Sequence, residues 1–380
     1  MRTEDVTWDD FLSESDDFEP VIADVSDPTN ILFSSGTTGE PKAIAWTHLT
    51  PIKAAADGHY HQDIKPSDVV AWPTNLGWMM GPWLIYASLV NKATMALYDD
   101  VPSTREFVQF VSDAGVSVLG VVPSLVAAWR ATSAFDGIDV STVRVLSSTG
   151  EASNADDMDW LMTTVDAPVV EYCGGTEIGG GYISCTVVEP AVAGMFSTPC
   201  LGLDLRIIGD DGESGGELFI VPPSIGLSEH LLNRDHDAVY YSELPDSDVP
   251  LRRHGDQIRR MPNGYYRAMG RVDDTMNLGG IKVSSAEIER TVSDVEGVAE
   301  VAAIAVAPAG GGPSELVLYV VPSEAEIDAE SMRVEMQGLI RAHLNPLFKI
   351  ALVVPIETLP RTASAKVMRR ELRSLAEGLV

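Results

Sequence analysis

Cysteine and basic residues are scarce in this 380-residue chain. The three cysteines, Cys173, Cys185 and Cys200, show no CxxC spacing and have no histidine cluster nearby, so neither a disulfide framework nor a zinc site is expected. Lysine and arginine number 26 against 56 aspartates and glutamates, which leaves a formal net charge of −30. Because nucleic-acid binding requires a basic surface, this composition disfavours that function.

Long apolar runs are also missing. No uncharged apolar stretch reaches the length of about 18 residues that a membrane span needs, and the acidic first ten residues lack the regions of a signal peptide. We therefore expect a cytoplasmic protein. The acids are spread along the chain, which fits either an ordinary acidic protein or adaptation to high salt. We favour the second, because salt screens the self-repulsion of so large a charge.

The pattern of apolar runs predicts the fold class. With 45% hydrophobic residues, the chain can bury a sizeable core in two or three domains. Alternating strand-like and helix-like runs predict an α/β large domain of layered sheets with helices, followed by a small α+β domain. The predicted boundaries are 1–272 and 273–380. The expected strands include Asn30–Phe33, Val69–Ala71, Ala93–Leu97, Val116–Val122, Val143–Leu146, Val169–Tyr172, Leu203–Ile208, Glu217–Val221, Ala299–Ala307, Glu315–Val321 and Ile350–Pro355. The expected helices include Thr104–Ala114, Leu125–Thr132, Ser285–Ser293 and Ala329–His343. The small domain is expected to begin with Asn277–Val283.

The sharpest motif is the string SSGTTGEPK at residues 34–42. Gly36 and Gly39 allow the backbone to approach a ligand closely, the hydroxyls and N–H groups can cradle phosphate oxygens, and Lys42 adds a positive charge. The Walker spacing GxxxxGK[ST] is absent. Taken alone, Gly-Thr-Thr-Gly fits a plain polar loop equally well.

Six further motifs follow in order along the chain. Taken alone, each motif also fits an ordinary structural feature without a function, such as a buried aromatic turn, a Gly-rich loop, a Gly-Asp turn or a solvated basic tail. They are 75–81 (NLGWMMG), 148–152 (STGEA), 171–177 (EYCGGTE), 254–256 (HGD), 270–289 (GRVDDTMNLGGIKVSSAEIE) and 360–370 (PRTASAKVMRR).

In this order the motifs resemble those of the adenylate-forming superfamily, which comprises acyl-CoA synthetases, luciferases and the adenylation domains of peptide synthetases. The resemblance covers nearly the whole chain and is strongest to acetyl-CoA synthetase-like acyl-activating enzymes of the plant type. It implies an AMP-forming acyl-CoA synthetase, a ligase that converts a small carboxylic acid and ATP into an acyl-adenylate and then passes the acyl group to CoA.

The resemblance also implies roles for individual residues. Lys366 and Thr176 are the implied catalytic residues, and Glu177 is the implied ligand of Mg²⁺. Tyr172 is expected beside adenine, because Cys173 replaces the family's aromatic residue there. The residues implied to bind ATP or CoA are Ser34, Ser35, Gly36, Thr37, Thr38, Gly39, Lys42, Gly150, Glu151, Glu171, Tyr172, Asp256, Arg271, Gly280 and Lys282. Asp273 is the implied pivot about which the small domain turns between the two half-reactions.

Three expectations concern the limits of this resemblance. Family members carry a large portion before the phosphate loop, so the chain is expected to be the C-terminal part of such an enzyme, with a separately encoded N-terminal portion as a possible partner. Two alternatives are an adenylating enzyme with another thiol acceptor, and an inactive or partner-dependent fragment. Gly174 stands where acetate-specific members carry tryptophan, which predicts space for acids longer than acetate.

Overall fold

The structure is a computed structural model, and the segments that it describes are 6–15, 17–34, 41–209, 215–278, 281–306, 314–323, 328–362 and 367–376. Among these residues, none of the helices combines the length and the apolar character that a membrane span needs.

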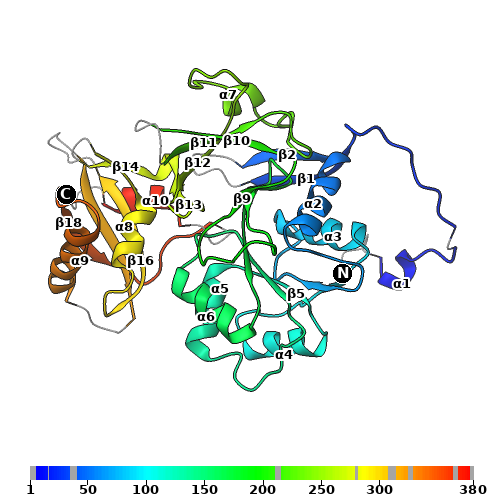
Figure 1. The fold of residues 1–380 in the computed structure, drawn as a ribbon, viewed down its shortest axis with the longest axis horizontal. Helices are drawn as coiled ribbons and strands as arrows, with labels where there is room; N and C mark the ends of the chain where they lie inside the picture. The colour runs from blue at the N-terminus through cyan, green and yellow to red at the C-terminus, as the bar shows by residue number, and fades with distance from the viewer. Residues whose placement is uncertain are drawn as a thin grey trace.

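A seven-stranded sheet forms the centre of the larger part of the molecule (Figure 1). Across the sheet its strands are β4 (Thr94–Ala96), β3 (Val69–Ala71), β5 (Val118–Val121), β6 (Val145–Ser148), β7 (Val169–Gly175), β8 (Gly180–Ser184) and β9 (Thr198–Pro199). The first five strands run parallel, whereas β8 and β9 are antiparallel to their neighbours. Parallel strands are normally covered on both faces, which explains why they read as continuous apolar runs.

Helices cover the two faces of this sheet. One group is α4 (Arg105–Asp113), α5 (Pro123–Thr132) and α6 (Ala155–Val165), and the other is α2 (Leu49–Tyr60) and α3 (Met80–Val90) (Figure 1). Side chains of a strand alternate between faces, so Leu119 and Leu146 join the core under the first group, while Val118 and Val145 join the core under the second. The predicted α/β fold of the large domain is confirmed.

The rest of this larger part consists of antiparallel strands and short helices. A short helix, α1 (Trp8–Phe11), precedes a hairpin of β1 (Pro28–Ser34) and β2 (Lys42–Thr47). A four-stranded sheet contains β10 (Asp204–Ile208), β11 (Gly215–Val221), β12 (Arg252–Arg260) and β13 (Tyr266–Arg271), and α7 (His236–Tyr240) lies in the connection between β11 and β12. These strands include the antiparallel elements predicted at Leu203–Ile208 and Glu217–Val221.

The C-terminal part has its own core. After the single turn η1 (Val272–Asp274), its elements are β14 (Thr275–Leu278), β15 (Ile281–Ser284), α8 (Ser285–Val292), β16 (Val298–Val306), β17 (Glu315–Pro322), α9 (Ala329–His343), β18 (Ile350–Pro355) and α10 (Arg369–Ala376). The sheet β16-β17-β18 packs against α8 and α9 on one face and against α10 on the other. This arrangement confirms the predicted small α+β unit.

Some details differ from the sequence-based expectations, which name no helix at α2 or α6. The segment predicted at Asn277–Val283 lies within a hairpin of two strands, β14 and β15. The helix α3 was not anticipated, because it is apolar around its whole circumference and so lacks the one-sided periodicity that reveals a surface helix.

Candidate active site

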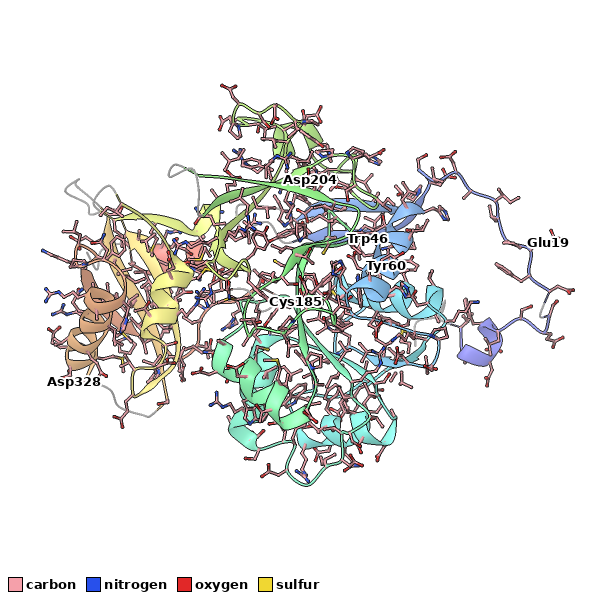
Figure 2. All side chains as sticks on the ribbon, viewed as in Figure 1. Glu19, Trp46, Tyr60, Cys185, Asp204 and Asp328 are labelled. Atoms are coloured by element: carbon pink, nitrogen blue, oxygen red, sulfur yellow. The ribbon has the colours of Figure 1, made fainter. Side chains whose placement is uncertain are left out.

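The site is built where the central parallel strands end. The motif at 148–152 follows β6, and the motif at 171–177 includes the last residues of β7 and the turn after it. The carboxyl ends of parallel strands form the usual ligand crevice of α/β sheets. Trp46, labelled in Figure 2, donates a hydrogen bond from Nε1 to the Thr176 carbonyl at 2.8 Å, so the β1–β2 hairpin is tied to this turn.

Lys42 and Glu177 form an ion pair at this edge. The Lys42 Nζ atom donates to Glu177 Oε1 at 3.1 Å and to the Tyr240 hydroxyl at 3.2 Å. Burial by itself would raise the pKa of Glu177, but Lys42, His254 and Arg252 hold the pKa of this carboxyl well below its usual range. Glu177 is therefore an ionised carboxylate in a buried position.

A second group of charges surrounds Asp256 on β12. Its carboxylate accepts hydrogen bonds from the Tyr182 hydroxyl at 2.6 Å and from Arg271 Nη1 at 3.0 Å, and His254 Nε2 lies 3.3 Å from Oδ2. Burial would raise the pKa of Asp256, yet His254, Arg271 and Tyr182 together hold it well below its ordinary value. The structure thus brings together two of the predicted residues, Asp256 and Arg271.

Gly175 connects the two groups. A Cβ atom added to Gly175 would lie 2.8 Å from Glu177 Oε2 and 3.0 Å from His254 Cε1. The carboxylate of Glu177 and the imidazole of His254 therefore face the same small space. A side chain at position 175 would enter this space unless the Glu177 carboxylate moved aside.

Three other predicted residues, Gly150, Glu151 and Ser34, lie in different surroundings. Gly150 has a φ of 95°, a left-handed value that suits glycine. The Glu151 carboxylate accepts a hydrogen bond from the Ser124 backbone N–H at 3.0 Å, in the first turn of α5, where a negative charge complements the helix dipole. Ser34 ends β1 opposite Lys42, and its Oγ is buried without a hydrogen-bond partner in the part of the chain that the structure describes.

Several predictions lie outside the described residues. Ser35, Gly36, Thr37, Thr38, Gly39, Gly280, Lys366 and the side chains of Lys282 and Asp273 belong to this group. Their assignments stay predictions.

Tyr172 is a core residue, which corrects its expected contact with adenine. Its ring is 2% exposed and lies 5.8 Å from the Trp83 ring, centre to centre. Its hydroxyl donates to Asp57 Oδ2 at 2.6 Å and accepts from Trp83 Nε1 at 3.1 Å. Because side chains alternate between the two faces of a sheet, the Tyr172 side chain points from β7 toward α2 and α3. Its position in the sequence does not by itself show which face of the sheet it lies on.

Glu171 is likewise engaged inside the protein. Oε2 accepts from the Ser153 hydroxyl at 2.7 Å, and Oε1 accepts from the Gly194 backbone N–H at 3.1 Å. The residue is 3% exposed, and burial raises the pKa of its carboxyl to about 7, although the hydrogen bonds from Ser153, Gly194 and Ser148 oppose this shift. The carboxylate is thus engaged by the protein itself, and the assignment of Glu171 to nucleotide binding stays a prediction.

The raised pKa of Glu171 predicts a pH-dependent stability. The folded state keeps the proton up to about pH 7, whereas the unfolded chain releases it near 4.5, so this contribution is complete below pH 4.5 and disappears as the pH rises through 7. Stability is expected to fall by about 1 kcal/mol from pH 6 to pH 8 because of this group. Urea unfolding of Glu171→Gln should show a pH dependence smaller by that amount, and an unchanged dependence would contradict the assignment.

Gly174 does not line an open pocket, contrary to the sequence-based expectation. It lies on β7 opposite Gly181 of β8, and a Cβ atom there would lie 2.0 Å from the Gly180 carbonyl oxygen and 2.8 Å from Gly181 Cα. The space beside Gly174 is filled by backbone. A tryptophan at this position would break the β7–β8 pairing instead of shortening an acyl pocket.

A buried ion pair on α2, which sequence reasoning missed, supports the turn after β7. Lys53 and Asp57 are 3% and 1% exposed, and Lys53 Nζ donates to Asp57 Oδ1 at 2.6 Å. The other oxygen, Oδ2, accepts from the Tyr172 hydroxyl and from the Gly181 N–H at 2.8 Å. Asp57 therefore joins α2 to both β7 and β8. The only sequence signal is a pair of opposite charges four residues apart in an otherwise apolar helix.

Asp57 also belongs to a buried group with His61 and Cys200 whose ligand atoms all lie within 4.8 Å of one another. His61 Nδ1 donates to the Cys185 carbonyl at 2.9 Å, and Nε2 accepts from the Leu201 N–H at 3.2 Å. Burial lowers the pKa of His61 and raises the pKa of the Cys200 thiol. Because both ring nitrogens and both Asp57 oxygens already have protein partners, this group is a hydrogen-bonded network of the core.

Comparison with known protein families shows to which family this chain belongs. The family described as AMP-binding enzyme matches residues 2–227, more than half of the chain, and the family described as AMP-binding enzyme C-terminal domain matches residues 287–366. The chain belongs to the AMP-binding enzyme family.

Relatives of this AMP-binding enzyme are long proteins of which it covers one part. Hexanoyl-CoA synthase from Cannabis sativa is 49% identical over 395 residues, which cover 98% of this chain and 54% of that protein. Probable acyl-activating enzyme 17, peroxisomal, from Arabidopsis thaliana is 49% identical over 391 residues, with the same coverage of 98% and 54%. The chain thus spans about half the length of the curated relatives that it matches.

A solved structure supports the fold. The acetoacetyl-CoA synthetase from Streptomyces lividans superposes with a TM-score of 0.83 at 24% identity, and the match covers 95% of this chain and 57% of that one. At this identity the likeness concerns the fold, including the presence of both the large part and the small C-terminal part.

Proposed function

We propose that this AMP-binding enzyme is an AMP-forming acyl-CoA synthetase, or the nucleotide-binding part of one. The observation that carries the proposal is the meeting of two charge groups at Gly175. The pair Lys42–Glu177 has the chemistry to hold phosphate and its metal ion, and Asp256, an acceptor-only carboxylate, suits the two ribose hydroxyls. Family membership and the names of the relatives support the same reaction.

In the first half-reaction, a carboxylate oxygen of the acid forms a bond to the α-phosphorus of ATP, and the bond from that phosphorus to the pyrophosphate oxygen breaks. No protein nucleophile is needed. The described residues position the reactants and neutralise charge. Asp256 accepts hydrogen bonds from the ribose, Thr176 lies at the turn beside the α-phosphate, and Lys42 neutralises phosphate oxygens.

Glu177 suits Mg²⁺. The ion prefers oxygen ligands and is commonly held by one or two carboxylates together with substrate phosphates, and the buried, ionised carboxylate of Glu177 matches that preference. When bound, the ion would neutralise phosphate charge. Glu177 would exchange its contact with Lys42 for this ligand, which leaves Lys42 to the phosphate.

The second half-reaction transfers the acyl group from the adenylate to the CoA thiol. Here we divide the chain into 1–272 and 273–380 and propose that the second part turns about Asp273. Separate hydrophobic cores on the two sides of η1 support this division. Lys366 would serve adenylation and Gly280 the CoA tunnel, while Lys282 would face the phosphate.

The acid is proposed to be longer than acetate. The support comes from the relative named hexanoyl-CoA synthase, since Gly174 offers no space. Each additional buried methylene would contribute about 0.8 kcal/mol to binding.

The rest of the enzyme is proposed to cover an apolar face beside the site. Within the described segments, β1 pairs only with β2, and an unpaired edge of this kind is normally covered. Large apolar side chains on neighbouring elements are 51% to 60% exposed, namely Ile31, Phe33, Ile52, Leu89 and Val90. We propose that a separately encoded N-terminal portion, corresponding to the length of the relatives that this chain does not span, packs here.

The test is acid-dependent exchange between ATP and labelled pyrophosphate, followed by thioester formation with CoA. Exchange is expected with hexanoate and weaker exchange with acetate, and it should increase when the proposed N-terminal portion is added. Absence of exchange with every acid, with and without that portion, would refute the function. Thioester formation with a carrier-protein thiol but not with CoA would favour the alternative acceptor.

We further propose a cytoplasm of high salt as the working environment. The net charge of −30 is the support, because screening by salt weakens repulsion among surface acids. The thermal midpoint of unfolding is expected to rise across a KCl series up to molar concentration. A midpoint that stays constant or falls would contradict this proposal.

A further inference from the structure

A fully buried arginine with unsatisfied donors lies beside the Lys42–Glu177 pair. Arg252 is the first residue of β12 and is 0% exposed. Its Nη2 donates to the Ser228 hydroxyl at 2.9 Å, whereas Nε and Nη1 have no hydrogen-bond partner among the residues that the structure describes. A guanidinium stays charged in proteins, and a buried charge without partners is costly. Each such group in a folded protein therefore requires an explanation.

The balance of charge around Arg252 indicates an anionic ligand. Lys42 is paired with Glu177 and Arg271 with Asp256. Among the described carboxylates none forms an ion pair with Arg252, although the chain carries 56 acidic residues. A surplus positive charge buried in so acidic a protein is what a polyanion such as a phosphate chain would compensate.

Two observations direct Arg252 toward the phosphate side of the site. Arg252 stands two residues before His254 on β12, whose pairing with β11 is irregular between Arg253 and Gln257. The His254 imidazole lies 3.3 Å from Asp256 Oδ2 and faces the space beside Gly175 that Glu177 Oε2 also faces. If Asp256 holds the ribose, then His254 and, beyond it, Arg252 follow the direction in which the phosphates extend. Within the described segments, His254 Nδ1 also has no hydrogen-bond partner.

The contacts of Arg252 reach Lys42 and Glu177 through two residues. Its Cζ lies 3.8 Å from the centre of the Tyr240 ring, and the hydroxyl of Tyr240 is 3.2 Å from Lys42 Nζ and 3.5 Å from Glu177 Oε1. On the other side, the backbone N–H of Ser228 donates to the Glu177 carbonyl at 2.8 Å.

We propose that Arg252, together with Lys42, binds the two terminal phosphates of ATP, the group that leaves as pyrophosphate. This inference rests on the proposed function and assigns that function a further binding residue. When the bond between the α-phosphorus and the bridging oxygen breaks, its electron pair stays on the pyrophosphate. The N–H groups of Arg252 and the ammonium group of Lys42 neutralise the additional negative charge, which favours departure.

The test compares the binding of AMP and pyrophosphate to the 380-residue chain by calorimetry. Arg252→Gln keeps most of the side-chain volume and a donor for Ser228 but loses the charge. It is expected to bind pyrophosphate about ten- to a hundredfold more weakly, as for the loss of hydrogen bonds to a charged group, and to bind AMP with unchanged affinity. The matched control is Arg253→Gln, because Arg253 is the next residue of β12, on the opposite face, where its Nε donates to Glu217 at 2.7 Å.

The outcomes separate this inference from the proposed function. If the wild-type chain binds neither AMP nor pyrophosphate, the proposed function fails and the inference fails with it. If the wild type binds both and Arg252→Gln binds pyrophosphate equally well, or loses AMP and pyrophosphate to the same extent, the inference alone is overturned. Should Arg252→Gln fail to fold, Arg252→Met decides, because it keeps an unbranched side chain and also removes the charge: weaker pyrophosphate binding with unchanged AMP binding supports the inference, and wild-type binding of both overturns it.

Discussion

Replacing Glu177 with glutamine is expected to slow acyl-adenylate formation by about a hundredfold or more, comparable with the loss of other preorganised charges in active sites. The substitution keeps the shape of the side chain and removes the charge that would hold Mg²⁺. The measurement is the rate of acid-dependent exchange between ATP and pyrophosphate at saturating Mg²⁺.

Binding without magnesium should respond in the opposite direction. In the wild type, Lys42 Nζ is engaged by Glu177 Oε1 at 3.1 Å, so a phosphate must compete with that carboxylate. Glutamine releases the ammonium group, and Mg²⁺-free ATP should bind Glu177→Gln at least as tightly as it binds the wild type, while Mg·ATP binds more weakly. This reversal distinguishes a metal ligand from a residue that merely supports the turn.

The control for Glu177→Gln is Glu217→Gln. Glu217 is also an ion-paired glutamate, with its Oε1 2.7 Å from Arg253 Nε, but it lies on β11, away from the β7 turn. Its replacement should leave the exchange rate unchanged. A similar loss in both variants would argue against a specific role for Glu177 in binding the metal.

Asp57→Ala is expected to lower the free energy of unfolding by about 3–5 kcal/mol, the cost of removing one partner from a buried ion pair. The substitution leaves Lys53 as a buried charge without its carboxylate and removes the acceptor of the Tyr172 hydroxyl and the Gly181 N–H. Urea unfolding monitored by fluorescence measures the effect.

The double variant Lys53→Met/Asp57→Leu removes both charges together and should recover much of the lost stability, because apolar residues can replace a buried pair at little cost. Asp204→Ala serves as the surface control. Its pair with Arg206 is 63% and 41% exposed on the two side chains, so a loss of at most about 1 kcal/mol is expected. Equal losses of unfolding free energy in Asp57→Ala and Asp204→Ala would show that the buried pair on α2 contributes no more to stability than an exposed pair.

Contiguous motifs were the most informative part of the sequence. The strings at 34–42 and 171–177 place glycines, hydroxyls and charges within a few residues of one another. The kind of ligand that they could bind can therefore be predicted without knowledge of the fold. The strands of the parallel sheet could also be predicted, because burial on both faces gives short continuous apolar runs such as Val169–Tyr172.

The sequence by itself therefore determined the fold class, the order of the domains and the group of candidate residues around Lys42, Glu177, Asp256 and Arg271. Only the tertiary structure decided which charges meet, because Lys42 and Glu177 are 135 positions apart and Asp57 and Tyr172 are 115 positions apart. It also decided that Tyr172 and Glu171 face the interior, that backbone fills the space beside Gly174, and that Arg252 is buried with two donors that have no partner among the described residues. The physical reason is that a local pattern specifies backbone conformation and residue chemistry, whereas burial, pairing and the pKa of a charged group depend on neighbours that other segments of the chain supply.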